Sequence, residues 1–306
     1  MGDVEVSVVD GTGRILLNRP KAINALTSDM IATMSRVLEE WAEDPTIDEV
    51  VISGAGRGFC AGADVREMRQ MIIEETGDPV EMLAREYCLD AMIASYPKPY
   101  RAQIHGIVMG GGMGVSIHGS HRSITADTVL AMPETIIGLW PDVGMCYHLA
   151  RIPGELGMYM ALTGLTITGD LATGVGLTDE LTEGTHQSTA PPAWMESAFA
   201  GDDIFAILER LETSELPHAR TTAETIRSRS PLSVAVSLEA IRRAATMTQE
   251  EVFAQDLQLG RFFCSWPDFV EGVRAQLVDK DFTPTWVHSS LEEVTAVEVR
   301  TAFGDS

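Results

Sequence analysis

Two carboxylates, Glu134 and Asp142, lie eight residues apart in the otherwise apolar and turn-forming stretch M-P-E-T-I-I-G-L-W-P-D-V-G, residues 132–144. Carboxylates rarely occur in apolar surroundings without a partner or a function. Just upstream, M-G-G-G-M-G at 109–114 places glycines where a helix is expected to begin, and this leaves backbone N–H groups open to a ligand. Acid–base side chains beside fixed amide donors suit acyl transfer at a thioester or ester.

The elements that must position these residues alternate between strands and helices as far as about residue 180. The sequence predicts a hairpin of strands over 4–9 and 14–17, a helix from the N-cap Thr27 to about Trp41, and strands over 49–53, 100–105 and 122–132. Beyond residue 190 it predicts helices over about 202–215, 220–229, 231–244, 248–265 and 267–278. We therefore expect an α/β core over 1–190 and a helical C-terminal region over 191–306.

Composition limits the classes of partner. The chain has 306 residues, is 45% hydrophobic and carries a formal net charge of −23, so its surface repels phosphate backbones and we expect no nucleic acid as a partner. A polyanionic ligand would need a local basic patch. No apolar run reaches the length of about 18 residues that a membrane helix needs, so we expect no membrane partner.

Cysteine usage favours a reducing compartment. None of the four cysteines, Cys60, Cys88, Cys146 and Cys264, forms a C-x-x-C pair, so neither a disulfide framework nor a zinc site is expected. The acidic N-terminal residues lack a basic leader pattern, and together these features predict a cytoplasmic protein. The histidines of H-G-S-H at 118–121 have metal-ligand spacing, but no further ligands accompany them, so no metal site is predicted.

Four segments carry a family resemblance in the right order along the chain: N-R-P-K-A-I-N-A-L at 18–26, G-F-C-A-G-A-D at 58–64, H-G-I-V-M-G-G-G-M-G at 105–114, and residues 132–144. They resemble the crotonase (enoyl-CoA hydratase/isomerase) superfamily, and within it most resemble the 3-hydroxyisobutyryl-CoA hydrolases. The segment 271–286 also resembles that subgroup. The resemblance implies a crotonase-like spiral of repeated β-β-α units followed by helices, which support oligomers in some members. It implies an acyl thioester of coenzyme A as substrate, no metal and no cofactor beyond that CoA, and a possible homo-oligomer.

The resemblance assigns an oxyanion hole to two backbone amides, the N–H groups of Ala63 and Gly111. Physical chemistry agrees, because attack on a thioester carbonyl puts negative charge on oxygen, and two preorganised donors stabilise it. Gly62 and Gly111 have no Cβ, so a ligand can approach the backbone closely. The alternative is that these glycines only make tight turns.

The resemblance places the catalytic carboxylate at Glu134. It can take a proton from water, or attack the carbonyl and form a mixed anhydride. Hydratases carry a second glutamate two residues after the glycine triplet, where this chain has Gly114. Asp142 is instead typical of the hydrolase subgroup. We expect it to bind the substrate's 3-hydroxyl or to orient Glu134 and water, the alternative being a simple turn aspartate.

Coenzyme A carries phosphates, which require positive charge on an acidic protein. The motifs place basic residues at Arg19, Lys21, Arg66, Arg69 and Lys280, each of which could also be a solvated surface charge. By the resemblance we assign CoA binding to Lys21, Ala22, Ala61, Asp64, Arg66 and Lys280.

The sequence thus predicts a thioester hydrolase that acts on 3-hydroxyisobutyryl-CoA, or a similar short 3-hydroxyacyl-CoA, in valine breakdown. An enoyl-CoA isomerase or hydratase of the same superfamily is the first alternative, since one glutamate is enough to shuttle one proton in an isomerase. A non-catalytic acyl-CoA binder is the second.

Overall fold

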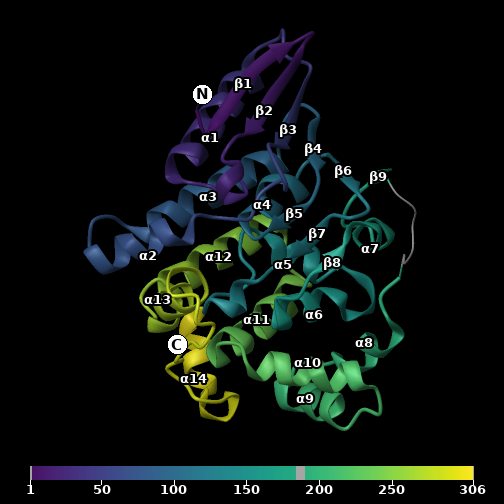
Figure 1. Ribbon diagram of the computed structural model, residues 1–306, viewed down its shortest axis with the longest axis vertical. Coiled ribbons are helices and arrows are strands. Elements are labelled where there is room, and N and C mark those ends of the chain that lie inside the picture. Colours follow the sequence, from purple (N-terminus) through teal and green to yellow (C-terminus); the bar gives the residue numbers. More distant parts are fainter. Residues whose placement is uncertain (1, 184–189, 306) are drawn as a thin grey trace. The chain divides into compact units, whose positions relative to one another are not determined.

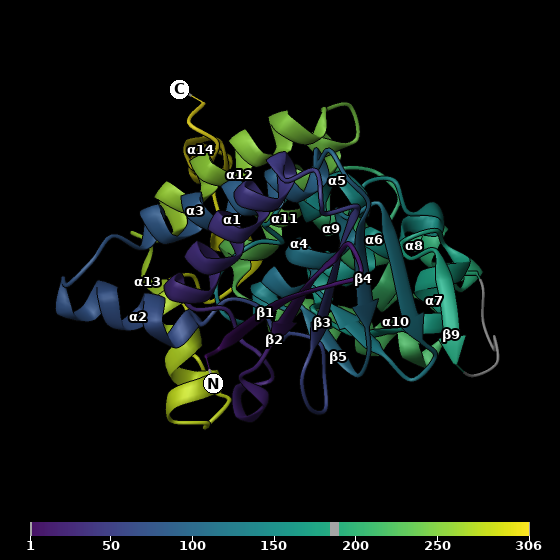
Figure 2. The same cartoon turned by 90° about the horizontal axis from the view of Figure 1, so that it is seen from above.

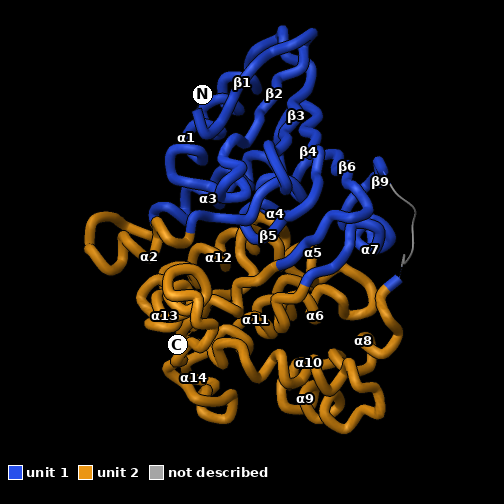
Figure 3. Tube along the Cα trace, viewed as in Figure 1, with its two compact units in different colours: residues 1–64, 81–131, 166–190 blue, residues 65–80, 132–165, 191–306 orange. Residues whose placement is uncertain are grey.

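A computed structural model describes residues 2–183 and 190–305 (Figure 1). The chain forms two compact units, each assembled from several stretches of sequence (Figure 3). Unit 1 comprises residues 1–64, 81–131 and 166–190, and unit 2 comprises residues 65–80, 132–165 and 191–306. The predicted division of the sequence at residue 190 stays a prediction.

Unit 1 holds every strand that the described residues form, in two sheets. The larger sheet has the order β1-β2-β3-β4-β6-β9, in which β1 and β2 are antiparallel and the other neighbours are parallel. Its strands are β1 Val4–Val9, β2 Thr12–Leu17, β3 Glu49–Gly54, β4 Tyr100–Ile104, β6 His121–Thr125 and β9 Glu180–Glu183. The smaller sheet, of order β5-β7-β8, contains β5 Ile107–Met109, β7 Val129–Ala131 and β8 Ile167–Thr168.

The predicted hairpin and the strands over 49–53 and 100–105 are confirmed as β1, β2, β3 and β4. The prediction of one strand over 122–132 is wrong, because β6 and β7 belong to different sheets. A turn separates them, in which the Thr128 N–H donates to the Thr125 carbonyl at 3.1 Å and the two threonine hydroxyls lie 2.8 Å apart. Threonine fits strands by propensity, but here its hydroxyls stabilise the turn.

Helix α1, Ser28–Glu43, covers one face of the larger sheet (Figure 2). Its N-cap is Thr27 as predicted, and the Thr27 hydroxyl accepts from the Met30 N–H at 3.3 Å. Its apolar side reaches Trp41, whose ring would lie 2.5 Å from a Cβ added to Gly13 of β2. Only glycine at position 13 therefore lets the indole lie directly on the strand. Two further helices of unit 1 matter below, α3, Pro79–Ala94, and α4, Gly111–Ile117.

Every regular element that the described residues of unit 2 form is a helix. Helix α11, Pro231–Ala244, is its most buried long helix, begins at the predicted Ser-Pro pair, and packs against α5, α6 and α14. The other helices are α2 Val65–Glu74, α5 Met145–Leu149, α6 Leu156–Thr163, α8 Ala193–Ala198, α9 Ile204–Glu212, α10 Pro217–Arg227, α12 Gln249–Phe263, α13 Pro267–Val273 and α14 Ala296–Ala302. Across the described parts of both units, no helix combines the length and apolarity that a membrane crossing requires.

Candidate active site

The first feature of the candidate site is the loop Cys60–Asp64 of unit 1. Ala63 forms an isolated parallel bridge with Leu26. The Leu26 N–H donates to the Gly62 carbonyl at 2.8 Å, and the Asp64 N–H donates to the Leu26 carbonyl at 2.7 Å. These bonds use the peptide groups on either side of Ala63, so the Ala63 N–H takes no part in the pairing.

The second feature is Gly111, the first residue of α4. The loop before it is fixed by two bonds, from the Met109 N–H to the Cys60 carbonyl at 3.0 Å and from the Gly110 N–H to the Ala131 carbonyl at 3.3 Å. The first N–H groups of a helix have no intrahelical acceptor. A Cβ added to Gly111 would lie 3.2 Å from the Ala63 nitrogen. The two amides that the sequence predicted as an oxyanion hole are therefore neighbours, and within residues 2–183 and 190–305 neither donates to a backbone carbonyl.

Sequence reasoning missed a carboxylate beside these amides. The Glu86 side chain on α3 is fully buried, and its Oε1 would lie 2.1 Å from a Cβ on Gly111. Position 111 must be glycine for this carboxylate to reach the loop. Glu86 and Asp90 interrupt the buried face of α3 at a spacing of one turn, alongside Leu83, Tyr87 and other apolar residues. A carboxylate pair on an apolar helix face was the signal that could have found them.

Asp90 lies beside Gly114, the position at which the family resemblance implies a second glutamate in hydratases. A Cβ on Gly114 would lie only 2.7 Å from Asp90 Oδ2, and the Asp90 side chain is fully buried. A glutamate at position 114 therefore does not fit while Asp90 occupies this space. The structure thus gives a steric reason for the missing second hydratase carboxylate.

The four unit 1 residues assigned to CoA binding lie on two adjoining segments. Lys21 and Ala22 belong to a 3₁₀ turn, Pro20–Ala22, and the Lys21 side chain is exposed. The Ala61 N–H donates to the Ile23 carbonyl at 2.8 Å, which joins the two segments. The Asp64 carboxylate pairs with Arg19 at 3.1 Å. This pair explains Asp64 structurally without any ligand, so its role in CoA binding stays a prediction.

Asn24 is a second residue that sequence reasoning did not single out. Its side chain is fully buried, and its Nδ2 lies 2.9, 3.0 and 2.9 Å from the carbonyl oxygens of Ala55, Gly58 and Phe59. Its Oδ1 accepts from the Arg19 N–H at 2.8 Å. One amide group therefore ties the predicted CoA-binding segment to the loop that leads to Ala63.

We expect Asn24→Ala to lower the free energy of unfolding by about 3 kcal/mol, because it leaves several buried backbone groups unsatisfied. Asn24 also has a φ of 55°, a left-handed conformation that alanine adopts less readily than asparagine. Chemical denaturation measures the change. Asn18→Ala, which removes a part-buried amide bound to the Glu5 side chain, is the matched control and should cost well under half as much.

Glu134 belongs to unit 2 and lies in the short 3₁₀ turn Glu134–Ile136. The Glu134 carbonyl accepts from the N–H groups of Ile137 and Leu139, both at 3.0 Å, so the backbone of this residue is fixed. Its side chain is only 6% exposed. This carboxylate is therefore buried, and its catalytic role stays a prediction.

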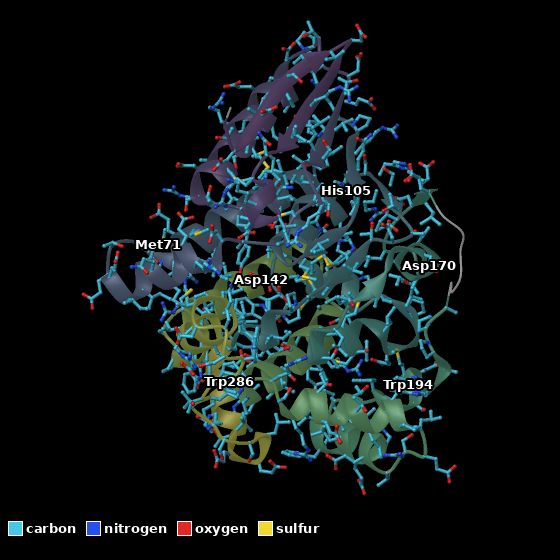
Figure 4. The ribbon with its side chains drawn as sticks, in the orientation of Figure 1. Met71, His105, Asp142, Asp170, Trp194 and Trp286 are labelled. Atoms are coloured by element: carbon cyan, nitrogen blue, oxygen red, sulfur yellow. The ribbon has the colours of Figure 1, made fainter. Side chains whose placement is uncertain are left out.

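Asp142, labelled in Figure 4, lies in a turn with unusual backbone conformation. Its side chain is 7% exposed. The next two residues, Val143 and Gly144, have left-handed φ values of 50° and 72°, which is rare for a β-branched residue such as valine. The fully buried Asp256 of α12 accepts from the Trp140 Nε1–H at 2.9 Å and from the Gly144 N–H at 2.8 Å.

The Cys146 thiol lies within electrostatic reach of the carboxylates of Glu134, Asp142 and Asp256, which all belong to unit 2. Burial raises the pKa of Cys146 well above its ordinary value, and the negative charges of Asp256, Asp142 and Glu134 raise it further. Burial also raises the pKa of Asp256 well above its usual range, with the charge of Asp142 as the next cause. Glu134 and Asp142 both lie close enough to Cys146 to act on its thiol electrostatically, and their shared role in catalysis stays a prediction.

The other two residues assigned to CoA binding, Arg66 and Lys280, lie near one segment of unit 2. The Arg66 guanidinium donates to the Leu277 carbonyl at 2.6 Å, and the exposed Lys280 follows three residues later. Arg69 also faces this region, since its Nε donates to the Val270 carbonyl at 3.1 Å. The Arg66 charge remains available to an anion because only one of its nitrogen atoms makes this bond.

The histidine pair that could have suggested a metal is accounted for otherwise. His118 is buried, and the His121 Nε2 lies 3.2 Å from a Glu180 carboxylate oxygen. Over the ranges 2–183 and 190–305, no group of three or more His, Cys, Asp or Glu side chains is arranged to hold a metal ion.

The model of the Enoyl-CoA hydratase/isomerase family matches residues 12–190 and 180–303. The chain belongs to this family. The α/β crotonase fold with a helical C-terminal region is thereby confirmed. Curated family members named "3-hydroxyisobutyryl-CoA hydrolase, mitochondrial" include those of Danio rerio, 36% identical over 96% of this chain and 87% of the relative, and of Homo sapiens, 33% identical over 95% and 86%.

Two solved crotonase-family structures are similar over nearly the whole chain. A carnitinyl-CoA dehydratase from Mycobacterium thermoresistibile has a TM-score of 0.93 and 37% identity, covering 98% of this chain and 96% of that one. An enoyl-CoA hydratase from Rhodobacter sphaeroides has a TM-score of 0.92 and 32% identity, covering 99% and 98%. The fold is therefore shared by family members whose names give different reactions.

The predicted cytoplasmic location is contradicted by the curated relatives, which are named as mitochondrial proteins. The prediction rested partly on the cysteines. Unpaired cysteines exclude only oxidising compartments, so they do not separate the cytosol from other reducing ones.

Proposed function

We propose that this crotonase-family protein hydrolyses the thioester of 3-hydroxyisobutyryl-CoA, or of a similar short 3-hydroxyacyl-CoA, to the free acid and CoA in valine breakdown. The observation that carries the proposal is the pair of neighbouring amides at Ala63 and Gly111. The names of the curated relatives, the presence of Asp142 and the glycine at position 114 favour hydrolysis over hydration.

In the proposed reaction the thioester carbonyl oxygen accepts hydrogen bonds from the Ala63 and Gly111 amides. Negative charge develops on this oxygen during attack, and donors already in place stabilise it without reorganising. The Glu134 carboxylate either attacks the carbonyl carbon or takes a proton from the attacking water. After attack by Glu134 the C–S bond breaks to leave a mixed anhydride, which water hydrolyses to the free acid and the regenerated Glu134 carboxylate. After attack by water the C–S bond breaks and the acid forms directly. In both routes the thiolate of CoA leaves and takes up a proton.

The remaining predicted residues are assigned to binding the 3-hydroxyl group and the CoA moiety of the substrate. Asp142 accepts a hydrogen bond from the 3-hydroxyl, which discriminates against acyl groups that lack it. The CoA moiety binds along Ala22, Ala61 and Asp64. Cationic side chains pair with the phosphates of CoA on this acidic protein, namely Lys21, Arg66 and Lys280. The reaction needs no cofactor beyond the CoA of its substrate.

A panel of CoA esters tests the proposal, with a thiol reagent to detect free CoA and absorbance of the conjugated thioester to detect loss of a double bond. The panel contains 3-hydroxyisobutyryl-CoA, its saturated analogue isobutyryl-CoA, and methacrylyl-CoA as the enoyl ester. We expect thiol release to be fastest from the hydroxylated ester. Hydration of the enoyl ester without thiol release would overturn the proposal.

A hydratase, dehydratase or isomerase is the second candidate, and the names of the two similar solved structures favour it. One carboxylate at Glu134 suffices for an isomerase, whereas a hydratase uses two. A protein that binds CoA esters and turns none of them over would instead be an acyl-CoA binder.

We expect Asp142→Asn to remove most of the thioesterase turnover, by about 10²-fold, because an amide at this position is neutral and presents only one acceptor oxygen. The thiol assay with 3-hydroxyisobutyryl-CoA measures the loss. Asp203→Asn, which alters an exposed helix-capping aspartate of unit 2, is the control. Full thiol release by Asp142→Asn would remove the role assigned to Asp142.

A further inference from the structure

Asp256 spans both ends of the turn that carries Asp142. Its Oδ1 accepts from the Trp140 side chain and its Oδ2 accepts from the Gly144 main chain, at 2.9 and 2.8 Å. The Asp256 carboxyl group is fully buried and comes from α12, more than 100 residues later in the sequence. A buried polar group that satisfies one donor on each side of a turn restricts that turn strongly.

The turn needs such a restraint because its backbone is strained. Val143 has a φ of 50°, and a β-branched residue keeps a left-handed conformation only when its surroundings impose it. Helix α12 supplies a second contact at the same place, since the Trp140 ring stacks on Phe263 with the centroids 5.2 Å apart. One helix therefore holds Trp140 through both an apolar and a polar contact.

Asp256 also lies close enough to Asp142 for the two carboxyl groups to interact electrostatically. Burial raises the pKa of Asp256 well above its ordinary value, and the nearby charge of Asp142 raises it further, while the hydrogen bonds from Trp140 and Gly144 act in the opposite direction.

We propose that Asp256 is a positioning residue that fixes Asp142 for recognition of the 3-hydroxyl group of the substrate. This inference rests on the proposed function, in which Asp142 accepts that hydroxyl. A hydrogen bond that discriminates between two acyl groups requires a carboxylate at a defined place, and a displacement of about 1 Å is enough to lose much of it. Asp256 thus determines specificity without contacting the substrate.

Three variants test the first half of the proposal, whether Asp256 holds the turn. Asp256→Ala removes both acceptors, Asp256→Asn keeps the volume and one acceptor, and Gln255→Ala alters a neighbouring buried residue that bonds to the Ala240 carbonyl instead. Hydrogen exchange of the Gly144 amide, measured by mass spectrometry over 140–146, should accelerate at least tenfold in Asp256→Ala and less in Asp256→Asn. It should stay unchanged in Gln255→Ala. Unchanged exchange in Asp256→Ala overturns the proposal.

The second half is tested by the ratio of kcat/KM for 3-hydroxyisobutyryl-CoA to kcat/KM for isobutyryl-CoA. General destabilisation lowers both values, whereas displacement of Asp142 lowers the ratio. We expect the ratio to fall about tenfold in Asp256→Ala, less in Asp256→Asn, and not in Gln255→Ala. A constant ratio despite accelerated exchange overturns the specificity role.

The proposed function can fail separately from this inference. If the wild-type protein releases no thiol from either ester, the proposed function is wrong. The ratio of the two dissociation constants, measured by calorimetry, then replaces the kinetic ratio. A fall of that ratio in Asp256→Ala supports the positioning role, and an unchanged ratio overturns it.

Discussion

Replacing Glu134 by glutamine is expected to lower kcat for thioester hydrolysis by about 10³-fold, because a positioned general base typically contributes 10²–10⁴-fold. Glutamine fills the same volume at a position that is only 6% exposed, so the fold should be kept. It can neither accept the proton of water nor form a mixed anhydride with the acyl group. Single-turnover thiol release from 3-hydroxyisobutyryl-CoA measures the effect.

The control is Glu196→Gln, which makes the same chemical change at an exposed position of α8 in the same unit. It should retain wild-type kcat. Calorimetry with CoA, the product, should give the same dissociation constant for wild type and Glu134→Gln, because the carboxylate is assigned to the acyl end. A kcat for Glu134→Gln within threefold of wild type would mean that another group activates water.

The second large effect is expected from Gly111→Ala, which should lower kcat by about 10²–10³-fold, as loss of an oxyanion donor does elsewhere. The new Cβ would lie 2.1 Å from Glu86 Oε1 and 3.2 Å from the Ala63 nitrogen, so both the carboxylate and the paired amides must shift. Chemical denaturation of Gly111→Ala separates this local effect from any loss of stability that the overpacking causes.

Gly77→Ala is the control, since its Cβ would meet only the flexible Met71 side chain, at 3.3 Å or more. It should retain full activity. The double variant Gly111→Ala with Glu86→Asp shortens the facing side chain by one methylene group, and partial recovery of kcat would trace the loss to this contact. Wild-type kcat in Gly111→Ala would remove the role assigned to the Gly111 amide.

The sequence predicted the elements whose signals are local. The amphipathic pattern and the Thr27 cap located α1, and the alternation of apolar residues located β1 and β2. The glycine triplet located the start of α4. In each case the periodicity or the cap is contained within one element, so no tertiary information is required.

The sequence predicted only those candidate site residues that belong to recognisable motifs. Glu134 and Asp142 stand in one short apolar stretch, and their burial follows from it. Glu86 was missed because its neighbour Gly111 lies in a different segment, and only the folded chain shows that the two are in contact. Asp256 was missed for the same reason, since its bonds to Trp140 and Gly144 join residues more than 100 positions apart.

The segment 122–132 shows a different limit of prediction from sequence. Its residues have the composition of one strand, yet hydroxyl pairing between Thr125 and Thr128 forms a turn there. Propensity describes each residue separately, whereas a turn depends on contacts between residues three positions apart.

The proposed function requires that the amides of Ala63 and Gly111 and the side chain of residue 134 act on one thioester carbonyl. The most direct measurement is a crystal structure of Glu134→Gln with uncleaved 3-hydroxyisobutyryl-CoA bound. We predict that the carbonyl oxygen lies within about 3.1 Å of both amide nitrogens, with the residue 134 side chain adjacent to the carbonyl carbon. A thioester bound away from these amides, or turned so that its carbonyl oxygen faces neither, would contradict the account.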